Sequence, residues 1–325
     1  MKIDFSVDHP ETYLAKVWRY AIRLILGFDL VHAWRNRDGI RASDIVWTHT
    51  ESQGLAVAWI LRRCAAPRPL LLMQSVWLMD RWPHMCPARR WWFQRLLRSA
   101  DVLTFLSPMN TADARAAFPG HRVELVLYGI AIDAMRKPAS PRKMANGTRV
   151  LSLGSDRHRD WATLIEAVAS SPIELRMVTN DSRANRIARG VPNVEIIQPP
   201  DNSCLSQEYD WADVVVVTLM ANRHASGVTV VEEATVMGKP VIVTDAGGMD
   251  AYFDTSCVTY VRVGDPQSLR DALQRFGHNP GPFHKKIPQA QHRMRDELNS
   301  HRYVERHVRL SEELLNTDGD QLHLR

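Results

Sequence analysis

The chain contains few cysteines and no long apolar run. Its four cysteines lie far apart and form no C-x-x-C pair: Cys64, Cys86, Cys204 and Cys257. This spacing argues against a disulfide framework or a zinc site and favours a reducing, cytoplasmic setting. No apolar run approaches the roughly 20 residues that span a bilayer, and the opening MKIDFSVDHPETY lacks the apolar core of a signal peptide. We therefore expect a protein that is not integral to a membrane.

Length and composition fit a globular protein of two domains. With 325 residues and 45% hydrophobic content, each half can bury a core of its own. The net charge of +5 is unevenly distributed, because residues 1–140 hold 19 Lys and Arg against 12 Asp and Glu and the remainder is net acidic. The basic half is expected to face an acidic partner or solvent alone.

Arginine and aromatic residues alternate between residues 77 and 98. The members are Arg81, Arg89, Arg90, Arg95 and Arg98 with Trp77, Trp82, Trp91, Trp92 and Phe93. The pattern suits a helix in an anionic lipid interface, which would make the protein peripheral on the inner face of the cell membrane. It equally suits a solvated helix whose aromatics enter the core. Nucleic acid is a third option, but we expect no such partner because no recognisable nucleic-acid module accompanies the charge.

Short apolar runs alternate with helical patterns, which indicates parallel sheets with crossover helices. In the first half, strands are predicted near 2–7, 29–34, 44–48, 70–75, 102–106 and 123–127, with helices near 11–26, 53–64, 87–98 and 109–117. The polar stretch Asp133–Thr148 is the predicted linker.

A second doubly wound sheet is predicted after the linker. Its strands are expected at 149–153, 173–178, 193–197, 213–218, 240–244 and 257–262, and its helices at 160–170 and 229–237. A last helix is expected at 303–315, with a frayed end over 316–325.

The predicted domains are 1–135, 149–282 and a helical tail at 283–325 that packs back on the first domain. Two such α/β domains would bind a ligand in a cleft between the carboxyl ends of their strands.

The segment 225–244, ASGVTVVEEATVMGKPVIVT, has the order of an anion site. Ser226 and Gly227 form a small-residue turn, and Thr229 with Glu232 has capping-box spacing at the start of a helix. Free amides and the positive end of the helix dipole suit phosphate. A ligand of nucleotide type is therefore expected.

Two motifs carry a family resemblance: E-A-x-x-x-G-x-P-V at residues 233–241 and G-x-x-x-x-[RK]-x-W-x-x-L-I-E-A at residues 154–167. Weaker correspondences lie at 44–49 (DIVWTH), 101–107 (DVLTFLS) and 128–130 (YGI). The chain resembles family 4 retaining glycosyltransferases of GT-B fold over roughly residues 40 to 265. The resemblance implies an α/β fold of two Rossmann-like doubly wound domains that face each other across a cleft.

The resemblance also implies site residues. Arg159 falls at the position of the phosphate-binding lysine of the family, with Arg157 as a second candidate, although DRHRDW could also be a solvated loop. Glu233 matches the second glutamate of the E-x7-E motif, which binds the ribose hydroxyls, while Glu232 would cap the helix or face solvent. The remaining substrate-binding candidates are Gly154, His224, Ser226, Gly227, Val228 and Thr229.

The chain departs from the family pattern at several positions. Ala225 stands where the first motif glutamate would contact the donor sugar, and adjacent His224 could reach the sugar or be merely exposed. The family's loop histidine after the fourth strand is replaced by Gln74 or Ser75. Near Gly247 and Gly248, Asp245 or Asp250 could supply an acceptor beside the donor, or the glycines could simply form a tight turn.

Candidate acceptor-activating residues follow two strands of the first half. His49, Glu51 and Asp80 could orient or deprotonate an acceptor hydroxyl, or His49 and Glu51 could only cap the helix near Ser52. In a retaining reaction on one face of the sugar, the leaving diphosphate can take the acceptor proton. Catalysis would then be mostly charge stabilisation by Arg159, Arg157 and the helix N-terminus.

The expected function is a metal-independent retaining glycosyltransferase. It would move a sugar from a UDP or GDP donor to a saccharide or lipid-linked acceptor in bacterial exopolysaccharide or glycolipid synthesis, with no cofactor and no metal. The alternatives are a non-catalytic GT-B scaffold that binds nucleotide or glycan and an enzyme that epimerises sugar nucleotides.

Overall fold

The computed structural model describes residues 3–8, 10–65, 67–138, 140–141, 147–198 and 205–322, with side chains up to residue 316. The predicted linker 133–148 therefore lies partly outside the described residues, as does Cys204. Cys64, Cys86 and Cys257 are free thiols. The chain divides into two compact units, unit 1 (Met1–Val126 with Arg306–Arg325) and unit 2 (Leu127–Glu305). No helix in the described ranges is both long and apolar enough to cross a membrane.

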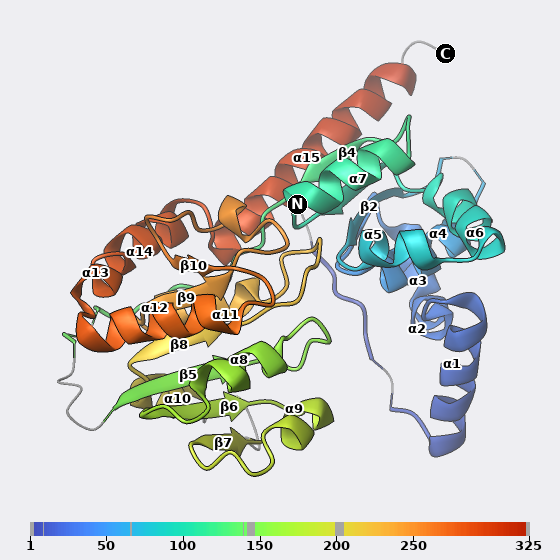
Figure 1. Ribbon diagram of the computed structural model, residues 1–325. Coiled ribbons are helices and arrows are strands. Elements are labelled where there is room, and N and C mark those ends of the chain that lie inside the picture. The colour runs from blue at the N-terminus through green and yellow to red at the C-terminus, as the bar shows by residue number, and fades with distance from the viewer. Residues whose placement is uncertain are drawn as a thin grey trace. The chain divides into compact units, whose positions relative to one another are not determined.

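Unit 1 is built on a parallel sheet with the strand order β1-β2-β3-β4. Its strands are β1 (Ile45–Thr48), β2 (Leu70–Ser75), β3 (Val102–Phe105) and β4 (Val123–Leu125), and the crossover helices are α4 (Glu51–Leu61), α6 (Pro87–Leu97) and α7 (Pro108–Ala117) (Figure 1). Ile45 pairs with Leu70 and Leu72 with Val102. All four residues of β3 are buried, as in a parallel sheet that is covered on both faces.

The segment before β1 is helical, which contradicts two predicted strands. It forms α1 (Tyr13–Leu26), α2 (Leu30–Arg35) and α3 (Arg37–Ala42), and residues 3–7 form no strand. The predicted strand 29–34 is thus α2. Asp29 caps this helix by accepting a hydrogen bond of 3.4 Å from the amide of His32. A short apolar run does not by itself distinguish a strand from a buried helical turn, and here the cap favours the helix.

The segment 77–98 turns most of its aromatics inward. It spans α5 (Leu78–Arg81), the 3-10 turn η1 (Trp82–His84) and α6. Phe93 is buried, and Trp82 and Trp92 pack against the same core. These residues therefore agree with the interpretation of a solvated helix whose aromatics enter the core. Trp91 alone among the helical aromatics is largely exposed.

Unit 2 contains a six-stranded sheet in which every neighbouring pair is parallel. The order is β10-β9-β8-β5-β6-β7. The strands are β5 (Thr148–Leu153), β6 (Ile173–Val178), β7 (Val194–Ile197), β8 (Val214–Val217), β9 (Val241–Thr244) and β10 (Thr259–Val261). The helices between them are α8 (Trp161–Val168), α9 (Ser182–Ile187), α10 (Leu205–Trp211) and α11 (Val228–Val236), with the 3-10 turn η3 (Met249–Ala251). This is the Rossmann strand order, whose winding reverses between β5 and β8.

The C-terminal region is helical. It comprises α12 (Pro266–His278), α13 (Gly281–His284), α14 (Ile287–Asp296) and α15 (Ser300–Leu322). The last helix is longer than the predicted 303–315, and the residues up to 322 that were expected to be frayed are helical. Within unit 1, Ser311 is buried and accepts a hydrogen bond of 2.8 Å from Nε1 of Trp47, which fixes the second half of α15 to β1.

Candidate functional site

Two loops of unit 2 meet at the carboxyl edge of the sheet, where the winding reverses. One loop follows β5 and the other follows β8. The amide of Asp160 donates to the carbonyl of Thr218 (3.1 Å), and the amide of Met220 donates to the carbonyl of His158 (2.8 Å). Ligands of open α/β sheets bind at this point, so the loops define the candidate site.

Arg159 is buried between two glycines of these loops. It is 5% exposed. A Cβ atom on Gly154 would lie 2.5 Å from its Nε, and one on Gly227 would lie 2.6 Å from its Nη1. Both glycines also have positive φ, +122° and +80°. Glycine is therefore required at both positions, because a side chain would displace the guanidinium as well as strain the backbone.

The guanidinium of Arg159 has unused hydrogen-bonding capacity. Across the described ranges, its Nε and Nη1 have no hydrogen-bond partner. Burial lowers the pKa of Arg159 to about 10, although Asp156 and Glu233 raise it, so the group remains a cation at neutral pH. A buried cation with unsatisfied donors is unfavourable unless a ligand completes it, and an anion is the chemistry that does so.

The helix α11 begins beside this arginine. Gly227 is its N-cap residue, and no side chain within the described ranges caps the helix. The predicted capping box of Thr229 and Glu232 is therefore wrong, because the helix begins at Val228 and the left-handed Gly227 makes the turn. The first amides of a helix lack intrahelical partners, so the N-terminus of α11 adds a second anion-binding element next to Arg159.

Glu233 on α11 is held by a tyrosine. The hydroxyl of Tyr209, on α10, donates a hydrogen bond of 2.8 Å to Oε2 of Glu233. Burial raises the pKa of Glu233, while Tyr209 and Arg159 lower it. The side chain is half-buried, which leaves the carboxylate able to accept further hydrogen bonds.

Glu232, its neighbour, lies in a different environment. The residue is fully buried, and neither of its carboxyl oxygens has a hydrogen-bond partner among the residues that the structure describes. The expectation that Glu232 caps the helix or faces solvent is therefore wrong. Burial, followed by the charge of Glu233, raises the pKa of Glu232 well above its ordinary value, which favours the neutral form of this acid.

A polar cluster surrounds Asp156 where the motif glutamate is missing. Ser226 Oγ donates to Asp156 Oδ2 (2.5 Å), and Nε2 of His224 lies 3.4 Å from the same oxygen. The amide of His158 donates to Asp156 Oδ1 (3.2 Å). Burial alone would raise the pKa of Asp156, but the hydrogen bonds from His224 and Ser226 hold it well below its usual range.

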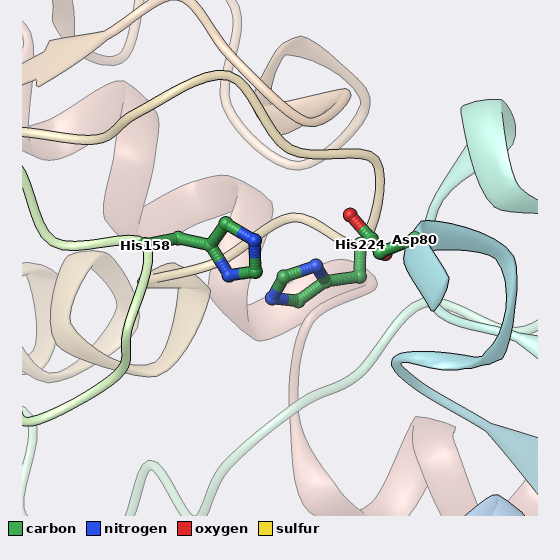
Figure 2. A group of neighbouring side chains, drawn as sticks. All are labelled: Asp80, His158 and His224. Atoms are coloured by element: carbon green, nitrogen blue, oxygen red, sulfur yellow. The ribbon is translucent and has the colours of Figure 1, made fainter. Parts of the chain in front are cut away.

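Two histidine rings pack together in this cluster. Figure 2 shows the rings of His158 and His224, whose centroids lie 4.8 Å apart. His224 is 4% exposed, so it is not the merely exposed loop histidine that the sequence allowed. Ala225 is buried with φ +53°, and its amide donates to the carbonyl of Gly247 (3.0 Å). The strained backbone at Ala225 thus directs its two neighbours toward Asp156.

The glycine pair after β9, Gly247 and Gly248, packs against the loop that holds Asn222 and Ser226. A Cβ atom on Gly247 would lie 2.2 Å from Oδ1 of Asn222, which in turn accepts a hydrogen bond from the amide of Ser226 (3.1 Å). The turn therefore has a packing role. Asp245 and Asp250 are both exposed.

The other predicted residues are placed as follows. Arg157 is exposed, and its carbonyl accepts hydrogen bonds from Arg183 (3.1 Å). Val228 and Thr229 are the first residues of α11. The structure thus brings together Gly154, Arg159, Ser226, Gly227 and Glu233, all within unit 2.

The acceptor-activating candidates lie in unit 1. Glu51 is buried at the start of α4, and its Oε2 accepts hydrogen bonds from the amides of Val76 (3.2 Å) and Trp77 (3.3 Å). This engagement favours a structural role. The cap of α4 is Thr50, so His49 does not cap it. His49 is exposed, and Asp80, the third residue drawn in Figure 2, lies in α5.

Gln74 and Ser75, which replace the loop histidine of the family, are buried at the end of β2. The side-chain amide of Gln74 donates to the carbonyl of His49 (3.1 Å). Neither residue therefore presents a group comparable to an exposed loop histidine.

Sequence reasoning missed Asp156 and Tyr209. Asp156 lies in a polar loop, and 70 residues separate it from Ser226, so only the adjacency of β5 and β8 reveals the contact. Tyr209 comes from α10, which the sequence pattern did not predict as a helix. An aromatic hydroxyl in a weakly patterned segment gives no local signal.

Comparison with known proteins identifies a related family and similar folds. Residues 147–279 match the family model described as "Glycosyl transferases group 1". No functionally curated protein matched the sequence. Sucrose-phosphate synthase from Thermosynechococcus elongatus superposes with a TM-score of 0.76 at 19% identity, covering 92% of this chain and 80% of that one.

Two further structures are similar. HepE (Alr3699) of Anabaena, in complex with UDP and glucose, has a TM-score of 0.69 at 15% identity, covering 88% of this chain and 81% of its own. The UDP-forming α,α-trehalose-phosphate synthase of Burkholderia xenovorans, in complex with glucose-6-phosphate, has a TM-score of 0.71 at 14% identity, covering 90% and 77%.

Two parallel α/β units with this strand order define the GT-B fold, which confirms the predicted fold class. Residues 147–279 match the group 1 glycosyltransferases, in line with the predicted resemblance to family 4. The prediction of a glycosyltransferase is thereby confirmed.

Proposed function

We propose that this glycosyltransferase is a retaining, metal-independent enzyme that binds its donor diphosphate through Arg159. The observation that carries the proposal is the buried guanidinium between Gly154 and Gly227, whose Nε and Nη1 have no partner in the described part of the chain. Together with the N-terminus of α11, it offers charge and hydrogen-bond donors to a diphosphate without a metal ion.

Glu233 is assigned to the ribose of the donor. Its carboxylate offers only acceptors to a vicinal diol, and Tyr209 holds one of its oxygens in place. HepE was solved with UDP-glucose, which supports a UDP donor, and GDP is the alternative base. Arg157, exposed on the same loop as Arg159, is proposed as an auxiliary contact to the diphosphate.

The transfer step requires no protein nucleophile. The bond between the sugar C1 and the diphosphate oxygen breaks, the acceptor oxygen bonds to C1 on the same face, and the acceptor proton passes to the departing phosphate. Arg159 and the amides of α11 stabilise the charge that develops on the leaving group. Unit 1 is proposed to bind the acceptor, with His49 and Asp80 as the residues that orient its hydroxyl.

The acceptor is proposed to be a saccharide carried on a lipid, in the synthesis of a bacterial polysaccharide or glycolipid. The test is transfer from a panel of UDP- and GDP-sugars in the presence of a chelator. Turnover that is insensitive to chelator and has retained stereochemistry supports the proposal, whereas strict metal dependence or an inverted product contradicts it.

A non-catalytic scaffold is the second candidate, because Ala225 replaces the motif glutamate. Tight nucleotide binding that is lost in Arg159→Ala, without transfer to any acceptor, would indicate the scaffold. Isomerisation of a sugar nucleotide in the absence of acceptor would indicate an epimerase.

A further inference from the structure

Asp156 places a carboxylate beside the position where the family motif has lost one. The motif glutamate would stand at residue 225, but Ala225 is buried, its amide donates to the carbonyl of Gly247 (3.0 Å), and its methyl group offers no hydrogen bond. The residues on either side contact Oδ2 of Asp156, at 3.4 Å from Nε2 of His224 and 2.5 Å from Oγ of Ser226. The loop after β5 therefore supplies a carboxylate to both neighbours of the substituted residue.

The carboxylate of Asp156 is ionised, fixed and still accessible. Burial would raise the pKa of Asp156, but the hydrogen bonds from His224 and Ser226 hold it well below its usual range. Oδ1 accepts from the amide of His158 (3.2 Å), and Nδ1 of the same histidine lies 3.4 Å from this oxygen. The side chain of Asp156 is nevertheless 27% exposed, so a ligand can reach it.

Asp156 also lies close to the proposed diphosphate-binding cation. The amide of Arg159 donates to the carbonyl of Asp156 (3.0 Å). Burial lowers the pKa of Arg159, and Asp156 has the strongest effect among the charges that raise it. An ionised carboxylate repels a diphosphate and offers it no hydrogen-bond donor. In a nucleotide sugar, the group bonded to the diphosphate on the side away from the ribose is the donor sugar, whose hydroxyls can donate to a carboxylate.

The other acidic side chains of the site are less suited to this contact. Glu232 is fully buried, so a sugar cannot reach it, and Glu233 is held by Tyr209 and assigned to the ribose. Asp245 and Asp250 are exposed, and no hydrogen bond from another described residue fixes either carboxylate. Asp156 alone among these five combines an ionised, fixed carboxylate with access for a ligand.

We propose that Asp156 accepts a hydrogen bond from a hydroxyl of the donor sugar, in place of the missing motif glutamate. Ser226 and His224 are positioning residues, because they hold the carboxylate. A sugar carboxylate at the same place would be repelled, so the donor presents a hydroxyl there. The assignment rests on the proposed function, since it requires the diphosphate to bind at Arg159.

The test compares nucleotide sugars with their own nucleotides in calorimetric titrations of the full chain. The ligands are UDP-glucose, UDP-galactose, UDP-N-acetylglucosamine and GDP-mannose, with UDP and GDP. We expect Asp156→Asn to weaken the binding of at least one nucleotide sugar about tenfold, as for loss of a hydrogen bond to a charged group. UDP and GDP should bind as tightly as to the wild type or more tightly, because a negative charge near the diphosphate is removed.

Two results of these titrations overturn the proposal. Equal weakening of nucleotide sugar and nucleotide in Asp156→Asn would show that Asp156 only shapes the loop. Unchanged binding of all four nucleotide sugars would show that Asp156 does not contact the sugar.

Asp160→Asn is the matched control on the same loop. Asp160 caps α8 by accepting a hydrogen bond from the amide of Thr163 (3.1 Å), and asparagine is also a good cap, so folding should be retained. We expect the ratio of nucleotide-sugar affinity to nucleotide affinity to equal that of the wild type. Asp245→Asn tests the competing carboxylate. The proposal is overturned if either of these variants changes the ratio and Asp156→Asn does not.

Deoxy analogues of the responsive nucleotide sugar identify the hydroxyl. Removing the hydroxyl that Asp156 binds should weaken wild-type binding about tenfold and Asp156→Asn binding much less, because both changes remove the same contact. Equal losses in the two proteins for every analogue would contradict the proposal. If the wild type binds neither UDP nor GDP, the proposed function fails and this assignment fails with it. Nucleotide binding that depends on Arg159, with nucleotide sugars insensitive to Asp156→Asn, counts against the role of Asp156 alone.

Discussion

The hydroxyl of Tyr209 donates a hydrogen bond of 2.8 Å to Oε2 of Glu233, and this contact joins α10 to the helix that carries the candidate ribose ligand. Burial raises the pKa of Tyr209 well above its ordinary value, so the phenol stays protonated and remains a donor. The contact orients the carboxylate and stabilises its charged form.

Tyr209→Phe removes that donor while keeping the ring. We expect the pKa of Glu233 to rise further and UDP or GDP to bind about three- to tenfold more weakly, as for loss of one hydrogen bond. Calorimetric titration at neutral pH and at pH 5 measures both effects, and the weakening should be larger at the lower pH. An unchanged Kd at both pH values would separate Tyr209 from the site.

Gly227→Ala tests the packing of the α11 turn on Arg159. The substitution strains a residue at φ +80° and places Cβ 2.6 Å from Nη1 of Arg159. Gly190→Ala is the control, because Gly190 has φ +84° but nothing within 4 Å of its Cβ position. Strain alone costs about 1–2 kcal/mol, and the overlap at Gly227 should add at least about 1 kcal/mol.

Urea denaturation compares the stability of these two glycine variants. In a nucleotide titration, we expect only Gly227→Ala to weaken binding. Equal losses of stability in the two variants, with nucleotide binding intact in both, would show that Arg159 does not occupy this turn.

Glu232→Gln tests the buried acid. The pKa of Glu232 is raised in the folded state, so the folded chain holds a proton that the unfolded chain releases. The stability of the wild type should therefore fall as pH rises from about 4.5 towards the folded pKa, by up to about 1.4 kcal/mol per pH unit. Glu232→Gln removes this dependence.

The measurement is urea denaturation of the wild type and Glu232→Gln at pH 5 and pH 8. We expect the advantage of Glu232→Gln to grow at the higher pH, with nucleotide binding retained. Parallel pH dependences in the two proteins would show that Glu232 is not buried as a neutral acid.

Asp156→Asn has the opposite pH dependence. Because the pKa of Asp156 is depressed in the folded state, its contribution to stability is present above its unfolded pKa of about 4 and is lost as pH falls below it. We expect Asp156→Asn to lower stability by about 1–2 kcal/mol at pH 7 and by less near pH 3. A constant difference across this range would indicate that the carboxylate charge is not what Ser226 and His224 stabilise.

The sequence predicted the parts of the fold that depend on burial. The run Val214–Val217 and the segment Val241–Thr244 are apolar at nearly every position, and they are the interior strands β8 and β9. The sequence-based prediction failed at residues 29–34, where the cap at Asp29 favours a helix and the apolar residues are interrupted by His32. The start of α11 was placed one residue late because a glycine in the left-handed conformation replaces the side-chain cap.

The candidate site was predictable only where its residues lie within a local motif. Arg159 and Glu233 were predicted because they match positions of the two family motifs that the chain resembles. Asp156 and its contact with Ser226 depend on the adjacency of β5 and β8, which no local pattern encodes. The burial of Glu232 next to half-buried Glu233 likewise depends on how α11 packs on its neighbours.

The most direct test of the account is titration of UDP and GDP into the wild type, Arg159→Ala and Arg157→Ala. Arg159 is buried, and its Nε and Nη1 have no hydrogen-bond partner among the described residues, whereas Arg157 is exposed two residues away on the same loop. We expect Arg159→Ala to weaken binding about 10- to 100-fold, as for loss of a charge-assisted contact, and Arg157→Ala to weaken it less. Wild-type affinity in Arg159→Ala would contradict the assignment of the diphosphate site.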